Sequence, residues 1–111
     1  MKPNKELLKG STGTMLLTLL SRGPLYGYDM IRELDRQSNG VFALKEGTLY
    51  PILHQMEAER WVEAYWETVG GRNRKYYRIT ERGRKTLAAK REEWSLFRNA
   101  VDGILGEGGG A

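Results

Sequence analysis

"EGTLYPILHQMEAERWVEAYWETVGGRNRKYYRIT", residues 46–80, changes its hydrophobic period halfway along. Its first part has apolar side chains at helical spacing: Ile52, Leu53 and Met56. Residues 61–69 instead alternate, with Val62, Ala64 and Trp66 on one face, and are rich in β-forming residues. The Gly-Gly-Arg-Asn sequence at 70–73 is typical of a turn, and residues 74–80 have the composition of a second strand. This stretch therefore predicts a helix followed by a β-hairpin.

Two further helices are expected before this stretch. The first spans roughly residues 5–20 and has one stripe at helical spacing: Leu8, Thr12, Met15, Leu16, Leu19 and Leu20. The "SRGP" sequence at 21–24 ends it, because glycine favours a helix C-terminus and proline cannot continue the helix. The second helix ends near Ser38, and its apolar residues recur at three-residue steps: Tyr28, Ile31 and Leu34.

A long helix is expected after the hairpin. Thr80 is a good N-cap, and the helical pattern continues for about 25 residues, as far as Leu105. Seven-residue spacing, interrupted by Lys90, relates the apolar residues that we expect at a dimer interface: Leu87, Trp94, Phe97, Val101 and Ile104. A helix with such a stripe must bury it, and a second copy of the chain is the simplest partner.

These elements predict an α+β fold that is mainly helical, with one small hairpin. Helices followed by a two-stranded wing indicate a winged helix-turn-helix DNA-binding domain over residues 1–80. Residues 81–105 form the predicted dimerisation helix, and residues 106–111, "GEGGGA", are expected to be a flexible tail.

Composition excludes several classes of function. The 111-residue chain has one histidine and no cysteine, so an ordinary zinc site and disulfides are not expected. The sequence contains no nucleophile or phosphate-binding motif, and we predict neither an enzyme nor a cofactor. The longest apolar run, "MLLTLL", is too short to span a membrane, and the N-terminus does not resemble a signal peptide. We therefore expect a cytoplasmic protein. The net charge of +4 permits a polyanionic partner without requiring one.

In a helix-turn-helix the second helix enters the major groove by its N-terminal end. The residues that we expect to contact DNA there are Lys45, Gly47, Thr48, Tyr50, Pro51, His54 and Gln55. Tyr50 is expected outside the core, because other residues already supply the buried face. Pro51 loses no hydrogen bond if Thr48 is the N-cap, and one if the helix begins nearer Lys45. Gly47 and Pro51 would equally suit a simple loop-to-helix boundary, and both interpretations stay open.

The hairpin tip is basic, and we expect no acidic neighbour beside its residues Arg74 and Lys75. Its expected DNA contacts, to phosphates or in the minor groove, are Arg72, Asn73, Arg74, Lys75 and Tyr76. A solvated turn with ordinary basic residues is the alternative. In the last helix, Trp94, Phe97 and Val101 either form dimer core or line a site where a planar aromatic ligand stacks between two subunits.

Three segments closely resemble the PadR family of bacterial transcription regulators: "YGYDMIREL", "EGTLYPILHQMEAERWVEAYW" and "GGRNRKYYRITERG". The GTLYP element and the RKYYRIT run are the most diagnostic. The resemblance extends from Leu16 into the final helix. One departure is the pair Arg60-Trp61, where the family usually has glycine and an aliphatic residue.

The single C-terminal helix is similar to that of the short branch of this family, which includes multidrug-sensing repressors. In those proteins the helix supplies a tryptophan to a ligand pore at the dimer interface, and Trp94 is the matching position. The resemblance implies a homodimer on a partly palindromic operator in double-stranded DNA, repression, and release by a small molecule. The phenolic-acid-responsive members have a longer C-terminal region, which argues against that ligand.

Two other functions fit the same fold. A winged helix can act as a protein-interaction adaptor, with the long helix paired to a different chain. An RNA-binding module is a weaker alternative. Specific binding to duplex DNA with a steep dependence on salt would distinguish the first function from both.

Overall fold

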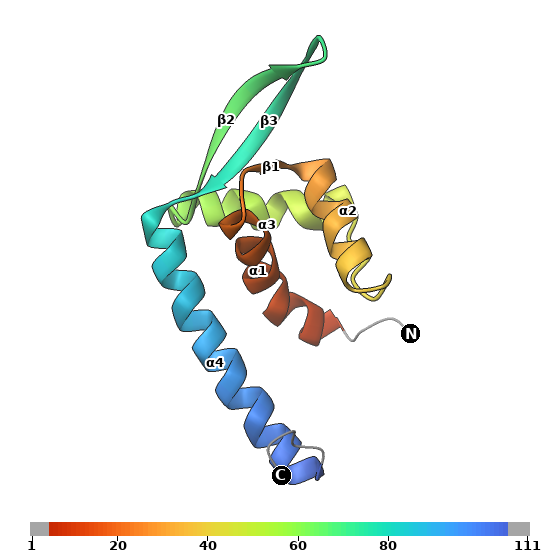
Figure 1. Ribbon diagram of the computed structural model, residues 1–111, viewed down its shortest axis with the longest axis vertical. Coiled ribbons are helices and arrows are strands. Elements are labelled where there is room, and N and C mark those ends of the chain that lie inside the picture. Colours follow the sequence, from red (N-terminus) through yellow and green to blue (C-terminus); the bar gives the residue numbers. More distant parts are fainter. Residues whose placement is uncertain (1–4, 107–111) are drawn as a thin grey trace.

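A computed structural model describes residues 5–106 of the chain, with side chains from residue 11 onward. The elements follow in the order α1 (Lys5–Ser21), β1 (Leu25–Tyr26), α2 (Gly27–Gln37), α3 (Glu46–Ala58), β2 (Val62–Val69), β3 (Arg72–Ile79) and α4 (Glu81–Leu105) (Figure 1). The α+β fold, the order of the helices and the hairpin are as predicted from the sequence. Of the predicted tail, only Gly106 is described. It caps α4 in the left-handed conformation, with φ 77°.

The core lies between the first three helices and the base of the sheet. Its fully buried side chains come from α1, α2, α3, β2 and β3: Leu16, Leu17, Leu20, Met30, Leu49, Leu53, Met56, Val62 and Tyr77. In α2 the buried face consists of Gly27, Met30 and Leu34. Tyr28 was expected on that face but is 54% exposed. The prediction that Tyr28 is buried was wrong, because residues at three-residue steps from Tyr28 lie on a face of α2 next to the buried one.

The wing is a three-stranded antiparallel sheet, not the two-stranded hairpin that the sequence predicted. The strand order is β1-β3-β2, and β1 pairs with β3 through Leu25↔Tyr77 and Tyr26↔Tyr76. A strand of two residues is too short to show a period of its own. The sheet thus joins the segment before α2 to the wing.

The hairpin of β2 and β3 extends well beyond the helices (Figure 1). Gly70 and Gly71 both have positive φ, at 59° and 80°, as a two-residue turn between twisted strands requires. Only the base of the hairpin is covered by the core. Val62 is therefore buried, whereas Trp66, on the same face of β2, is 68% exposed.

Helix α4 leaves the domain on the opposite side from the wing (Figure 1). It packs against α1 near its start, where Leu87 is buried, while every residue from 91 to 100 is exposed. Leu87 was expected at a dimer interface, and the structure corrects this: its side chain already lies in the core of its own chain. Thr80 is the predicted N-cap, and its Oγ1 accepts a hydrogen bond from Gly83 N at 3.0 Å.

The corner between α3 and β2 is bound to the start of α4. Thr80 N donates to Trp61 O at 3.0 Å, and Thr80 Oγ1 donates to Arg60 O at 2.6 Å. Further along α4, the Lys90 ammonium lies 5.3 Å from the centre of the Trp61 ring. This contact explains the polar interruption in the apolar stripe of α4, because Lys90 faces Trp61 of its own chain.

Arg60 has a left-handed backbone, with φ 63°. Trp61 N donates to Met56 O at 2.9 Å and Arg60 N to Glu57 O at 3.0 Å, which is the Schellman arrangement that ends many helices. Glycine is the usual residue at this position because it has no Cβ. The departure noted in the sequence thus changes the residue but leaves the turn intact.

Candidate nucleic-acid interface

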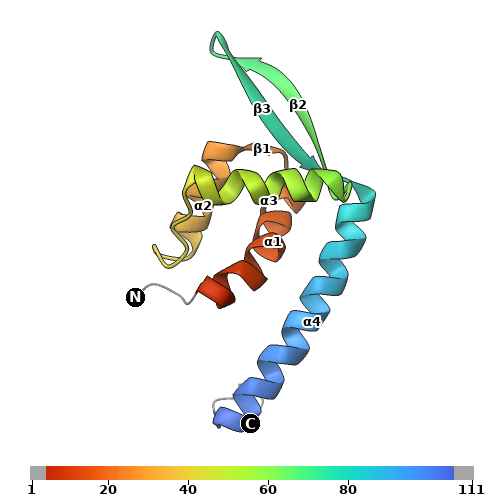
Figure 2. The same ribbon diagram turned by 180° about the vertical axis from the view of Figure 1, so that it is seen from behind.

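Helix α3 runs across the side of the domain, between α2 and the base of the wing (Figure 2). It begins at Glu46 with Lys45 as N-cap, and Lys45 makes no side-chain capping hydrogen bond. Pro51 is therefore inside the helix and loses one backbone hydrogen bond, which is the second of the two alternatives. Leu49, Leu53 and Met56 turn inward. The predicted DNA contacts that lie exposed are Lys45, Gly47, Thr48, Pro51, His54 and Gln55.

Nothing in the described part of the chain requires glycine at position 47. It is helical and exposed, and a Cβ placed on it would meet nothing within 4 Å. Glycine inside a helix costs roughly 0.5–1 kcal/mol relative to alanine. The absence of a side chain here leaves the backbone of α3 open to close approach from outside.

Tyr50 is half-buried and packs against the core, in contrast to the expectation that it lies outside it. Its hydroxyl lies over Gly27 at the start of α2, where a Cβ would come within 2.5 Å of that oxygen. Its ring centre is 6.4 Å from that of the exposed His54. Tyr50 therefore holds α3 against α2, and its aromatic ring neighbours a side chain on the open surface.

The basic residues of the wing do not form one cluster. Neighbouring strand residues point to opposite sides, so the five predicted contacts divide between two faces. We call the side that packs on the helices at its base the core-side wing face: Val62, Ala64, Trp66, Thr68, Asn73, Lys75, Tyr77 and Ile79. The other side is the outer wing face: Tyr26, Glu63, Tyr65, Glu67, Val69, Arg72, Arg74, Tyr76 and Arg78.

On the outer wing face three tyrosines form a row across the sheet. The ring of Tyr76 lies 5.6 Å from that of Tyr26 and 5.8 Å from that of Tyr65. The guanidinium of Arg74 covers Tyr26 at 4.6 Å, a cation–π arrangement. Glu67 is the residue paired with Arg74 across the strands, so the expectation that no acidic residue lies near Arg74 was wrong.

A second arginine of the outer wing face is also engaged. Arg78 lies 4.9 Å from the Tyr65 ring, and its Nε is 3.2 Å from the Glu63 carboxylate. Both side chains of this ion pair are more than half exposed, so it contributes little to stability.

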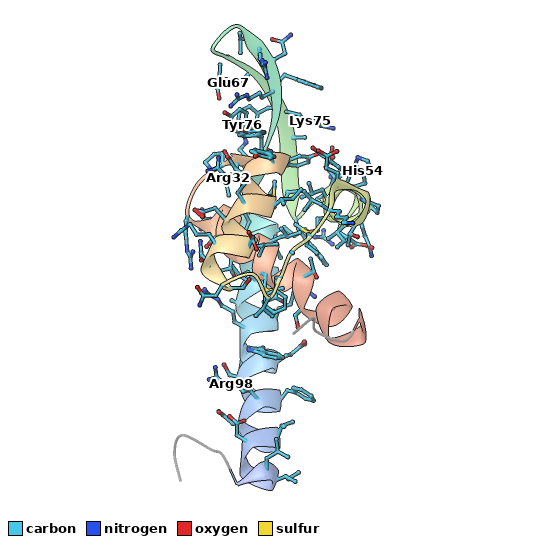
Figure 3. All side chains as sticks on the ribbon, turned by 90° about the vertical axis from the view of Figure 1, so that its right-hand side faces the viewer. Arg32, His54, Glu67, Lys75, Tyr76 and Arg98 are labelled. Atoms are coloured by element: carbon cyan, nitrogen blue, oxygen red, sulfur yellow. The ribbon has the colours of Figure 1, made fainter. Side chains whose placement is uncertain are left out.

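The core-side wing face continues the exposed surface of α3. His54 and Lys75 project to the same side of the molecule, whereas Tyr76 and Arg32 project to the opposite side (Figure 3). Lys75 is opposite Trp66 in the strand register. Asn73 Oδ1 accepts a hydrogen bond from Thr68 Oγ1 at 2.7 Å, which fixes the amide near the tip. We call this combined surface, α3 together with the core-side wing face, the α3–wing surface.

Other types of site find no support within residues 5–106. No group of three potential metal ligands comes together there. The same part of the chain has no helix long and apolar enough to cross a membrane.

The sequence matches the transcriptional regulator PadR-like family over residues 16–89. The chain belongs to the PadR family. The transcriptional regulator Rv3488 of Mycobacterium tuberculosis is 30% identical over 87 residues, which cover 78% of each chain. Membership in the PadR family shows that the protein is a transcriptional regulator with a DNA-binding fold.

Solved structures of transcriptional regulators have the same fold. A transcriptional regulator from Clostridium thermocellum superposes with a TM-score of 0.82 at 30% identity, over 88% of this chain and 96% of its own. A PadR-like regulator from Bacillus cereus gives 0.81 at 28% identity, over 91% and 97%. Because both matches extend well past residue 89, the shared PadR architecture includes much of the long final helix.

The apolar side of α4 is open in the single chain. Trp94 is 46% exposed, and its ring centre lies 6.1 Å from that of Phe97. Val101 is half-buried. Three more apolar side chains of α4 are exposed, and only the last of them was predicted at the dimer interface: Leu96, Leu105 and Ile104.

Proposed function

We propose that the protein is a cytoplasmic, homodimeric repressor that binds a specific DNA operator through the α3–wing surface. The observation that carries this proposal is that the exposed His54 of α3, a helix whose first turn is open at Gly47, lies on the same side of the molecule as Lys75 of the wing. Helix α3 would enter the major groove, and the wing would contact the flanking backbone. RNA binding and adaptor function are the alternatives that the experiment below distinguishes.

A second copy of the chain is the proposed cover for α4. Ile104 is 87% exposed, Leu96 67% and Phe97 57%, and a helix with so much open apolar surface needs a partner. Closed two-fold symmetry is the commonest solution for soluble oligomers. A two-fold dimer would present two α3 helices, which suits a partly palindromic operator.

Trp94 and Phe97 are the proposed ligand-binding residues of that dimer. Their rings are inclined at 31° and form a broad aromatic wall. The carboxylates of Glu93 and Asp102, on the same helix, favour a planar, apolar cation. A ligand that fits one crossing of the two helices better than another would change the separation of the two α3 helices. The ligand can weaken DNA binding only to the extent that its affinity differs between the two arrangements of the dimer.

The DNA test uses fluorescence anisotropy of labelled duplexes, with the promoter nearest to the gene and a scrambled duplex, over a series of salt concentrations. We expect preferential binding of the promoter duplex and a linear fall of log K with log salt. A structured RNA of matched length serves as control. Absence of binding even at low salt would favour an adaptor.

The ligand test uses Trp94→Ala. Planar cationic dyes should release the DNA from the wild-type dimer and lose this effect with the variant, which should remain dimeric in sedimentation. If the variant is monomeric, Trp94 belongs to the dimer core instead of a ligand site.

A further inference from the structure

Trp66 differs from the other two tryptophans of the chain. Trp61 is half-buried and faces the Lys90 ammonium, and Trp94 lies against Phe97. Trp66 is 68% exposed, and within residues 11–106 its ring has neither an aromatic nor a cationic partner. An indole this exposed contributes little to the stability of the fold.

The position of Trp66 is set by the strand register. It faces Lys75 across β2 and β3, on the core-side wing face, and not the tyrosine row of the outer wing face. It lies four residues beyond Val62 at the base of the hairpin, a distance of about 14 Å at the usual rise of a strand. His54 of α3 projects to the same side as Lys75 (Figure 3). A duplex seated on α3 would therefore meet Trp66 and Lys75 together.

We infer that Trp66 packs into the minor groove of the operator, against deoxyribose and base edges, while Lys75 holds a phosphate at the border of that groove. This inference rests on the proposed function and names a further contact residue. Apolar side chains on thin protein elements are suited to the minor groove, where they wedge against base steps. Helix α3 would occupy the adjacent major groove, so the wing extends past it toward the minor groove.

This contact would add sequence preference without hydrogen bonds to bases. Inserting a side chain between bases costs the least free energy at flexible pyrimidine–purine steps, which are easily unstacked. We therefore expect a preference for TA or CA/TG steps at the two positions of a palindromic operator that flank the α3 contacts.

The experiment makes Trp66 the sole indole by combining Trp61→Phe and Trp94→Phe. Acrylamide, a neutral quencher, is then titrated against Trp66 fluorescence with and without promoter duplex. We expect the free protein to be quenched readily and the DNA complex to be protected. Trp66→Ala in the otherwise unchanged chain should weaken binding by about 10-fold to 100-fold, the scale of one base–aromatic contact. The dependence of log K on log salt should stay the same, because an indole releases no counterions.

Val69→Ala is the matched control. Val69 is on the same strand, is 39% exposed and lies on the outer wing face, so its truncation should leave DNA affinity unchanged. Full DNA affinity in Trp66→Ala, or an indole that stays open to acrylamide in the complex, would overturn this inference and leave the proposed function intact. Protection of Trp66 in the dimer before DNA is added would overturn it as well. Absence of DNA binding by the wild type would instead overturn the proposed function itself.

Discussion

The backbone of Gly83, in the first turn of α4, lies directly against the carbonyl oxygen of Trp61, at the corner between α3 and β2. A Cβ on Gly83 would overlap that oxygen and would come within 2.8 Å of Ile79 Cγ1. No side chain larger than hydrogen fits here without movement of the backbone. Together with the hydrogen bonds of Thr80, this contact fixes the start of α4 relative to α3 and the wing.

Gly83→Ala should lower the free energy of unfolding by about 1–3 kcal/mol, the usual cost of overpacking, because the added methyl group meets backbone atoms. Chemical denaturation followed by circular dichroism measures this. Gly47→Ala, which adds the same group where nothing lies within 4 Å, is the control. Equal effects of the two substitutions would show that the corner is looser than the structure indicates.

Gly47→Ala should have opposite effects on stability and on DNA binding. Alanine is the better helix former, so the free energy of unfolding should rise by roughly 0.5–1 kcal/mol. If a DNA backbone approaches α3 at this position, the same methyl group should weaken binding to the promoter duplex in anisotropy measurements. Unchanged affinity would place Gly47 outside the contact.

Lys75 and Arg74 are neighbours in sequence but lie on different faces of the wing, so their substitutions should differ. Lys75→Ala should reduce the slope of log K against log salt by about 0.9, the value for one phosphate contact. Arg74→Ala should leave the slope nearly unchanged, because this guanidinium lies over Tyr26 on the outer wing face. Two equal reductions would mean that the duplex reaches both faces of the wing.

Tyr77 has a buried hydroxyl without a hydrogen-bond partner among the described residues. Burial, more than the nearby Glu57 carboxylate, raises the pKa of Tyr77 above its ordinary value of about 10. As pH rises above about 10, Tyr77 loses its proton in the unfolded chain before it does so in the folded chain. This difference lowers the free energy of unfolding above about pH 10 and has no effect well below it.

Tyr77→Phe should therefore raise the free energy of unfolding at neutral pH by about 1 kcal/mol, through removal of an unpaired polar group. It should also reduce the loss of stability above about pH 10. Denaturation between pH 7 and 11 measures both effects, with the exposed Tyr28→Phe as control. A marked fall in stability at pH 7 would indicate that the hydroxyl has a partner.

The elements that the sequence predicted well are those whose signals are local. The cap at Thr80, the Gly-Gly turn and the change of period after α3 each depend on a few adjacent residues, and all three are present in the structure. Residue periodicity could also place Leu53 and Met56 in the core.

The features that sequence reasoning missed depend on packing between distant segments. Strand β1 exists only because Leu25 and Tyr26 meet β3. Tyr50 is half-buried because Gly27 leaves room for its hydroxyl. The division of the wing residues between two faces could have been foreseen from the strand period of two, since Arg74 and Lys75 are consecutive.

The pairing of β1 with β3 also has a consequence for the order of folding. The β2–β3 hairpin closes through a tight turn and can form early, whereas Leu25 must find Tyr77 across about 50 residues of chain, at a higher entropic cost of closure. The third strand can therefore join only when α2 and α3 have been brought together. Transient release of these two residues would open this edge of β3, while the buried Val62 and Tyr77 keep the base of the hairpin in the core. We expect the backbone amides that join β1 to β3, around the pair Tyr26 and Tyr76, to exchange hydrogen faster than the amides that join β2 to β3 at the centre of the hairpin.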